Sequence, residues 1–578
     1  MIKNLLFEFV NYIFYFSNFF KIFFIFKKKK NEFKLYLNFK NNINKETYFF
    51  TKINNNNNKK YFKIVIFENV HVLSIDNLWV ENTSIDKEVF FYKIRFNWLL
   101  FDNEHLSHQD KINLMKDFIK KNDYHKFDSY SVSERISNWI MYIKSCEKII
   151  QYDDLEIFNN YLRYQIYYLI NNLEYHDEKT NNHIISNAKS IYLYSLFFNN
   201  SNLNNLSKKI FIYSINKNFY KSGFLNEGSS HYQLLISKHI IEILYFNKIY
   251  KDINLDDYII NFFYKVLKHS FLFTVNTEVI NFGDLTPDIP SKYLKLLPFL
   301  SNQLFGIKFP VKFIKTQLFS KDYINLFNLK EFKVPILIKD YYYFYDKESG
   351  YLIYKNLDIL FFTQLINSNV IKPRTHQHSE IGNFILFYKN ELIFLDKGRF
   401  SYEKSTLNSV SSESHNFVKI NNFEPMLCHK LNALPEIMNS EYFQKKPDYN
   451  ISLENQKILI SVTFYGFERF PFKSIIKRKF FIEKDYFEIN DKIISNKNTT
   501  LVSFFHFNGN LLIKKNNQIN LFTHNNKKYL FYLSTGLIKN INKNNYYSTN
   551  YAVKKTCSSI IIQKKITKKY MQTYKIKF

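Results

Sequence analysis

Two histidines stand one residue apart in the segment RTHQHSE, directly before an alternating apolar run. Because residues two apart share one face of a β-strand, the spacing predicts that His376 and His378 reach into one site together. Imidazole groups can transfer protons near neutral pH or bind a metal ion. The role of the pair therefore depends on which other side chains converge on it.

Two residues further along the chain offer ligands for a metal. Asp396 ends a predicted hairpin strand, and His415 follows in the segment SSESHNFV. With His378 they supply three ligands of the kind that bind tetrahedral Zn²⁺, with water or substrate in the fourth position. The alternative is that each histidine is separately hydrogen-bonded in a polar pocket, and spacing alone does not separate the two. The three cysteines have no metal or redox spacing, so any metal site must use histidine and carboxylate ligands.

Two helical segments carry polar residues inside apolar surroundings. Asn182 and His183 open the apolar stretch HIISNAKSIYLYSLFF. Glu227 and Tyr232 lie in FLNEGSSHYQLL, a predicted loop that leads into a helix. Each segment alone also fits a helix cap and a buried aromatic residue. The sequence contains no Gly-rich phosphate loop, nucleophile elbow or His-Glu-x-x-His helix, so these segments are the main candidates for chemistry.

The candidate segments fall in two regions of different texture. Residues 85–320 carry apolar residues at three- and four-residue spacings, as in SERISNWIMYIKSCEKII, and predict successive helices in a bundle, solenoid or toroid. Residues 321–578 contain β-rich runs around turn residues, such as GNFILFYKNELIFLDKG, and predict an antiparallel β-sandwich. The sequence therefore predicts a helical domain followed by a β domain.

Residues 1–84 combine an apolar N-terminal segment with a polar, Asn-rich linker. Glu8, Asn11 and Lys21 interrupt the apolar segment, and no small-residue cleavage site follows it. The pattern therefore predicts neither a signal peptide nor a transmembrane span. An amphipathic helix fits better, packed on the protein or in contact with a membrane surface.

The formal net charge of +29, from 80 Lys and Arg against 51 Asp and Glu, favours a polyanionic partner. Lys, Asn, Ile, Phe and Tyr dominate throughout, however, which is typical of a compositional bias, and charge alone selects no partner. The basic residues are spread along the chain without a recognised nucleic-acid-binding motif. This pattern argues against nucleic acid as the partner.

Taken in order, six segments resemble the heparinase II/III-like family of polysaccharide lyases. They cover roughly residues 85–430 and read YSVSERISNWI, NNHIISNAKSIYLYSLFF, NEGSSHYQLL, INFGDLTPDIP, THQHSEIGNFILFYKNELIFLDKG and ESHNFVKINN. The family joins a helical (α/α) toroid to an antiparallel β-sandwich, in agreement with the two predicted regions. Its members cleave uronic-acid polysaccharides by β-elimination. The resemblance therefore implies an acidic polysaccharide, such as a glycosaminoglycan, as the substrate.

The resemblance also implies catalytic roles. Asn182 and His183 correspond to the family's Asn-His pair at the substrate carboxylate. Tyr232 corresponds to the catalytic tyrosine on the loop before a toroid helix, and His376 to the histidine of the sandwich domain that faces the substrate. The reaction needs donors that neutralise the carboxylate, a base for the C-5 proton and an acid for the leaving oxygen. Tyr232 and His376 divide the last two roles, and the sequence leaves open which of them is the base.

Further residues follow from the same correspondence. His378, Asp396 and His415 match the ligands of a zinc ion that is generally structural in the family. Tyr402 matches a substrate-contacting tyrosine, and Glu227 is also predicted to bind substrate. Arg135 either contacts substrate or is a buried structural residue, and we favour the structural role.

The chain departs from the family pattern at several positions near the predicted site. An Arg-rich segment usually found before the last histidine is replaced by STLNSVSSES. The other departures are Glu380 in place of Asp, Gln233 in place of His and Phe417 in place of Thr. These changes bear on substrate choice more than on fold.

A second function therefore stays open: a protein of capsule, lipopolysaccharide or exopolysaccharide assembly that binds the glycan without cleaving it, or acts on it differently. The resemblance implies the periplasm or cell envelope, whereas the lack of a convincing signal peptide favours the cytoplasm.

Overall fold

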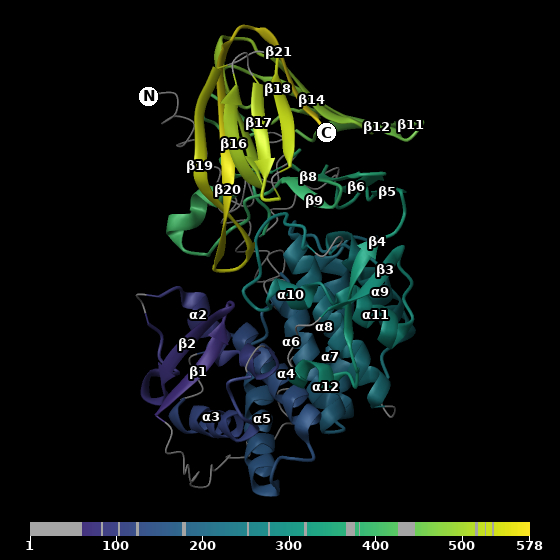
Figure 1. Cartoon of the computed structure of the whole chain (residues 1–578). Coiled ribbons are helices and arrows are strands. Elements are labelled where there is room, and N and C mark those ends of the chain that lie inside the picture. The colour runs from purple at the N-terminus through teal and green to yellow at the C-terminus, as the bar shows by residue number, and fades with distance from the viewer. Residues whose placement is uncertain are drawn as a thin grey trace.

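The computed structural model describes residues 60–578, apart from 83–84, 102–103, 123–126, 176–180, 251–253, 275–277, 317–320, 366–375, 381, 426–444, 515–517, 526 and 535–536. The apolar N-terminal segment and the Asn-rich stretch lie outside the described residues. The end of the predicted linker range instead contains a hairpin of β1 (Tyr61–Ile66) and β2 (Asn69–Ser74). Alternate residues of β1 are buried in the helical core, and Figure 1 places the hairpin beside α2 (Lys87–Ile94).

The region that follows is helical. Four of its longer helices, α3, α4, α7 and α8, begin at side chains that accept hydrogen bonds from the first turn, such as Asp128 before α4 and Ser229 before α8. The helices after α2 are α3 (His108–Lys121), α4 (Ser129–Cys146), α5 (Tyr152–Asn171), α6 (His183–Phe197), α7 (Ser201–Asn218), α8 (Ser230–Ile249), α9 (Asp257–Leu267), α10 (Ser291–Leu294), α11 (Leu297–Phe305) and α12 (Lys321–Leu326). Of the described helices, none is both long enough and apolar enough to cross a bilayer.

The helical region is followed by antiparallel strands. A hairpin of β3 (Val311–Thr316) and β4 (Phe332–Leu337) lies beside α11. The nine-stranded sheet has the order β19-β20-β15-β9-β8-β7-β6-β5, with β10 paired to β15. Its strands are β5 (Tyr341–Tyr345), β6 (Tyr351–Asn356), β7 (Ile359–Gln364), β8 (Phe384–Tyr388), β9 (Glu391–Phe394), β10 (Val418–Ile420), β15 (Thr499–Phe507), β19 (Leu537–Asn550) and β20 (Val553–Ile566).

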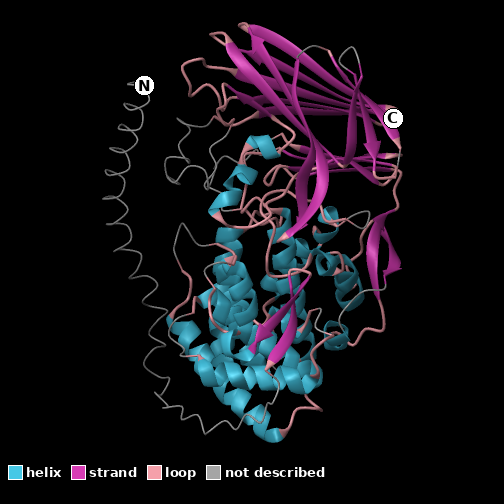
Figure 2. Ribbon diagram, turned by 60° about the vertical axis from the view of Figure 1, so that its left-hand side comes forward, coloured by secondary structure: helices cyan, strands magenta, loops and turns pink. Residues whose placement is uncertain are grey.

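A second, eight-stranded sheet completes the sandwich, in the order β11-β12-β13-β14-β21-β18-β17-β16. Its strands are β11 (Asp448–Glu454), β12 (Lys457–Phe464), β13 (Ile475–Glu483), β14 (Tyr486–Ile494), β16 (Gly509–Lys514), β17 (Gln518–Thr523), β18 (Lys528–Leu533) and β21 (Lys569–Lys577). Figure 2 shows the strands of the two large sheets gathered at one end of the molecule and most of the helices at the other. The predicted fold class, a toroid-like helical region followed by an antiparallel β-sandwich, is confirmed.

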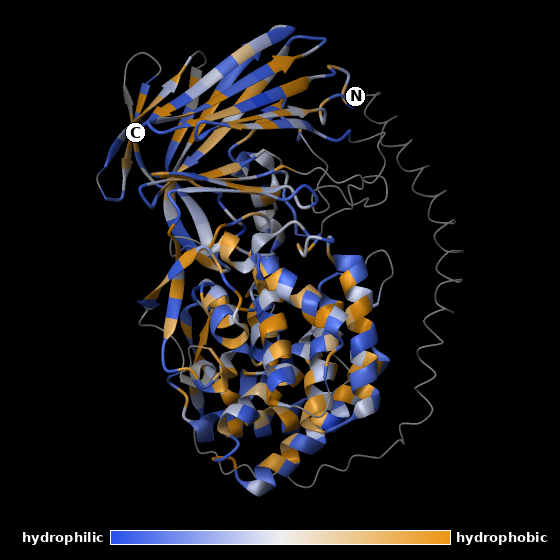
Figure 3. Ribbon diagram, turned by 90° about the vertical axis from the view of Figure 1, so that its right-hand side faces the viewer, coloured by the Kyte–Doolittle hydropathy of each residue, from blue (hydrophilic) through white to orange (hydrophobic). Residues whose placement is uncertain are grey.

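The central strands β6, β7 and β8 of the nine-stranded sheet are buried on both faces. In β6, Tyr351 and Ile353 belong to the hydrophobic core of the helical region, whereas Leu352 and Tyr354 belong to the core between the two sheets. Hydrophobic and hydrophilic positions alternate along the strands of the eight-stranded sheet, as Figure 3 shows. Successive side chains of a strand point to opposite faces. The nine-stranded sheet therefore packs against the helices with one face and against the eight-stranded sheet with its other face. The two domains are thus joined by a continuous apolar core.

Candidate active site

The predicted site residues, apart from Arg135, gather where the helices meet the nine-stranded sheet. Tyr130, His183 and Tyr232 lie in the first turns of α4, α6 and α8 respectively. The loop that contains His376 and His378 precedes β8 and packs against the segment around Asp284. Because helix N-termini carry partial positive charge, three converging first turns favour a negatively charged group in this place.

Asn182 stands at the start of α6, but its side chain makes no capping hydrogen bond. Instead, its Nδ2 donates to Glu227 Oε2 at 2.7 Å and its backbone N–H donates to Oε1 at 2.6 Å. The same Nδ2 lies 3.5 Å from Nε2 of His376. Glu227 therefore orients the amide of Asn182 toward His376, and both residues are almost fully buried.

His183 forms a charged pair with a carboxylate that the sequence did not point to. Its Nδ1 lies 2.5 Å from Glu174 Oε2, and its ring stacks on Tyr130 with 4.3 Å between centroids. Burial opposes the positive charge of His183, but the hydrogen bond and charge of Glu174 outweigh it and raise the pKa of His183 above its usual 6.5. The side chain is 32% exposed, so a cation is available to an acidic ligand.

Tyr232 contacts two further predicted residues, one through its ring and one through its hydroxyl. Its ring stacks on His376 with centroids 3.5 Å apart and planes 13° apart. Its hydroxyl lies 2.8 Å from the hydroxyl of Tyr402, which itself donates to the carbonyl of Leu285. Because each hydroxyl has one proton, Tyr232 must be the donor to Tyr402. Burial raises the pKa of Tyr232 well above 10, so the phenol keeps its proton at neutral pH.

His376 and His378 lie in the loop before β8, whereas their spacing predicted a strand. They nevertheless meet at one group, since Nδ1 of His376 and Nε2 of His378 lie 2.9 Å and 3.0 Å from the two oxygens of Asp284. The backbones approach closely here: a Cβ on Gly283, whose φ is +71°, would lie 2.4 Å from the carbonyl oxygen of His376. Burial lowers the pKa of His376 to about 4, against the charge of Glu227, so its ring is neutral near pH 7.

A group of three buried side chains fits a metal ion among the described residues. Donor atoms of His378, Glu380 and His415 all lie within 4.8 Å of one another. Each residue has a buried polar atom without a hydrogen-bond partner, namely Nδ1, Oε2 and Nε2 respectively. Asp396, the carboxylate predicted as the third ligand, lies outside this group and accepts a hydrogen bond from His415 Nδ1 at 2.6 Å. The orphaned atoms are what a coordinated cation would satisfy.

Arg135 lies away from this site, inside α4. It is 1% exposed, donates to the carbonyl of Ile94 at 2.8 Å and to Gln165 at 3.1 Å, and stacks on two phenylalanines. These contacts satisfy its guanidinium within the helical core. They support the structural role over contact with a substrate.

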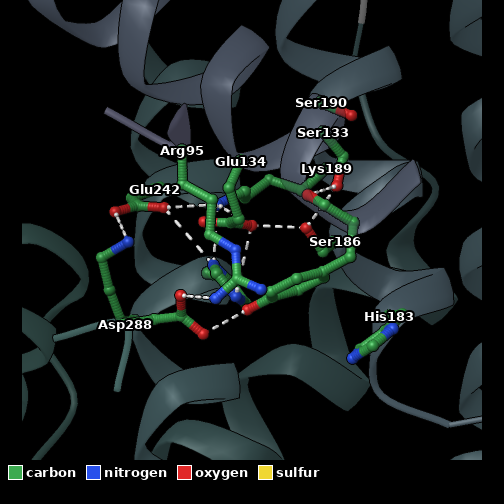
Figure 4. A network of polar contacts seen from close by, with 12 residues as sticks. Arg95, Ser133, Glu134, His183, Ser186, Lys189, Ser190, Glu242 and Asp288 are labelled. Carbon is green, nitrogen blue, oxygen red and sulfur yellow. Dashed lines mark hydrogen bonds and ion pairs between the residues drawn. The ribbon is translucent and has the colours of Figure 1, made fainter. Parts of the chain in front are cut away.

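A network of buried charges joins the helices that carry the site (Figure 4). Lys189 of α6 lies 3.1 Å from Glu134 of α4, 3.2 Å from Glu242 of α8 and 2.7 Å from the neighbouring His239. At the first turn of α4, Asp288 pairs with Arg95 at 2.7 Å and accepts from Tyr130 at 2.8 Å. The network ties α4, α6 and α8 together, which fixes the relative positions of their first turns.

Four contributors were not identified from the sequence: Glu174, Tyr130, Asp284 and Glu380 as a member of the metal group. Tyr130 and Asp284 lie in two segments that resemble the family, YSVSERISNWI and INFGDLTPDIP. The resemblance could therefore have pointed to them. No comparable signal marks Glu174.

The sandwich domain, which contributes the histidine loop to the site, matches a known family. Residues 344–576 match the family model described as heparinase II/III-like, C-terminal. No curated protein matches the chain in sequence. The predicted resemblance to the heparinase II/III-like family is thus confirmed for residues 344–576 by sequence, and solved structures share the fold of both domains.

The chain is similar to a crystal structure of heparinase III, with a TM-score of 0.64, 14% identity, and 88% of this chain and 79% of that chain covered. A mutant heparan sulfate lyase from Pedobacter heparinus gives a TM-score of 0.57, with 13% identity and 86% and 78% covered. Chondroitin AC lyase from Streptomyces coelicolor A3, in complex with chondroitin sulphate, gives 0.51, with 8% identity and 85% and 74% covered. At these identities the likeness establishes a common fold.

Proposed function

We propose that this protein is a polysaccharide lyase that cleaves a uronic-acid-containing polysaccharide by β-elimination. The observation that carries the proposal is the packing of Asn182, Tyr232 and His376, from three distant segments, with a neutral imidazole 3.5 Å from an amide and stacked on a protonated phenol. The similar structures include a heparan sulfate lyase and a chondroitin AC lyase in complex with chondroitin sulphate, which supports the same reaction class.

The first requirement of the reaction is to neutralise the uronate carboxylate so that the C-5 proton becomes acidic. His183 supplies a positive charge at the exposed edge of the site, held by Glu174. The amide of Asn182 supplies an N–H donor beside it. A carboxylate held by these two groups would also face the positive ends of α4, α6 and α8.

The proton transfers then divide between the stacked rings. Nε2 of His376 takes the C-5 proton, the C4–O bond breaks, and a C4=C5 double bond forms. Tyr232 gives its hydroxyl proton to the leaving glycosidic oxygen. The resulting imidazolium is stabilised by carboxylates at both nitrogens, Asp284 at 2.9 Å and Glu227 at 3.5 Å. Solvent exchange returns both rings to their starting states, so that atoms and charge balance.

We also propose a structural Zn²⁺ ion, held by His378, Glu380 and His415, since their orphaned donor atoms fit its preference for nitrogen and oxygen ligands. When bound, the ion would cross-link the histidine loop before β8 to the segment before β10. Asp396 would then orient the ring of His415 through its Nδ1. The site residues would gain a fixed loop, and the proton transfers would remain with His376 and Tyr232.

The proposal is tested by ultraviolet absorbance during incubation with heparan sulfate, heparin, alginate, polyglucuronate and chondroitin sulfate. We expect one polymer to give a rising signal from the unsaturated uronate, lost in Asn182→Ala. Saturable binding of a polymer with no unsaturated ends formed from any of them would refute the lyase and favour a glycan-binding protein.

A further inference from the structure

Asp284 is a fully buried carboxylate that was not identified from the sequence, and the proposed reaction uses it only to stabilise the imidazolium of His376. Its Oδ2 lies 2.9 Å from Nδ1 of His376, and its Oδ1 lies 3.0 Å from Nε2 of His378. Arg399 donates to the same Oδ1 at 3.3 Å. One side chain thus contacts a histidine of the proposed reaction and a histidine of the metal group.

The backbone around Asp284 holds this arrangement in place. Its N–H donates to the carbonyl of His376 at 2.9 Å, and its carbonyl accepts from the hydroxyl of Ser229 at 2.7 Å. Ser229 is the N-cap of α8, whose first turn carries Tyr232. The carboxylate of Asp284 is therefore fixed relative to α8, to the loop that carries His376 and to the Tyr232 ring that stacks on His376.

An ionised carboxylate only accepts hydrogen bonds, so each imidazole nitrogen that faces it must carry a proton. In neutral His376 the proton then sits on Nδ1, which leaves Nε2 bare and directed at Asn182 and Glu227. In neutral His378 the proton sits on Nε2, which leaves Nδ1 bare, and this is the atom without a hydrogen-bond partner in the metal group.

We propose that Asp284 is a positioning residue that selects the tautomers of both histidines, so that one carboxylate aims the His376 base at the substrate and presents His378 Nδ1 to the metal. The part that concerns His376 rests on the proposed function, whereas the tautomers themselves do not. A single substitution at Asp284 should therefore change the tautomer of His376 and leave that of His378 unchanged.

Asp284→Asn is nearly isosteric and replaces one acceptor by an NH₂ donor. The amide oxygen should stay on the Oδ1 side, because His378 and Arg399 both donate there. The NH₂ group then faces Nδ1 of His376 and forces its proton onto Nε2. We expect kcat to fall on the order of 10²- to 10⁴-fold with KM changed little, since the base nitrogen is now occupied. Zinc content should stay at the wild-type value.

The direct test is nitrogen NMR of protein labelled with ¹⁵N-histidine, with His376 and His378 assigned from their Gln variants. We expect protonated Nδ1 for His376 in the wild type and protonated Nε2 in Asp284→Asn, with His378 unchanged. Because no substrate is needed, a tautomer switch in a protein inactive on every polymer would refute the lyase and leave this inference standing. An unchanged His376 tautomer would overturn it.

The half of the inference that concerns the metal is tested by Zn²⁺ titration of chelator-treated Asp284→Ala. Loss of the acceptor for His378 should weaken Zn²⁺ binding about 10- to 100-fold. Wild-type affinity would overturn this half, and if the variant does not fold, the His378 resonances of Asp284→Asn decide it instead. Asp491→Asn is the matched control, because Asp491 is equally buried but pairs with Arg478 in the sandwich. It should alter neither tautomer nor Zn²⁺ affinity.

Discussion

Replacement of Tyr232 by Phe separates the proposed acid from its structural surroundings. The ring would keep its stacking on His376, since only the hydroxyl is removed. That hydroxyl makes one hydrogen bond, to Tyr402, which retains its own bond to Leu285. Loss of one such bond costs about 0.5–1.5 kcal/mol of unfolding free energy. Loss of a general acid slows turnover roughly 10²- to 10⁴-fold, which is about 3–5 kcal/mol of activation free energy.

The two effects are large enough to measure apart. Urea unfolding gives the stability, and ultraviolet absorbance on the polymer that the wild type cleaves gives the rate. Tyr192→Phe is a matched control, because Tyr192 is also buried and its hydroxyl donates one hydrogen bond, to Asn247 at 2.7 Å. It should lose similar stability and no activity. A Tyr232→Phe protein with full activity would refute the assignment of the acid.

Three further predictions follow from the charged groups. In the wild type, KM should be lowest below pH 6.5, where His183 is a cation, and should rise as the pH increases through the raised pKa of His183. In Glu174→Gln the same rise in KM should occur at lower pH, because the carboxylate that raises the pKa is gone. Both profiles are measured from about pH 5 to 8. Glu380→Gln should lower the zinc content of purified protein by elemental analysis, whereas Asp396→Asn should retain it; the reverse result would make Asp396 the ligand. Glu134→Ala removes one carboxylate from a fully buried lysine and should cost about 3–5 kcal/mol in urea unfolding.

The fold class could be predicted because its evidence is local. Apolar residues at helical spacing marked α4 and α8, and hairpins with turn residues between apolar runs marked β6–β7 and β8–β9. The strand at 61–66 could also have been predicted, since its sequence YFKIVI is rich in β-branched and aromatic residues, but the adjacent Asn-rich stretch led to the prediction of a linker over the whole range. Local pattern did not reveal which face of β6 would meet the helices.

The site could be predicted only as far as residue types allow. Asn182, Tyr232, His376 and Tyr402 were chosen by resemblance, and the structure brings them together. Their orienting partners could not be chosen in this way, because Glu227 is 45 residues from Asn182, and other partners are more distant still. A carboxylate that orients a catalytic group looks, in sequence, like any other carboxylate.

The continuous apolar core between the domains bears on how such a site can work. Tyr351, Ile353 and Phe362 of the sandwich belong to the same buried cluster as the helices, so separating the domains would expose a large apolar surface. Domain interfaces that are large and hydrophobic resist relative motion. His376 of the sandwich and Tyr232 of the helices are therefore held in contact without a substrate to close them. The proposed base and acid are thus preorganised, and binding energy would be left for the substrate carboxylate that we propose to lie at His183.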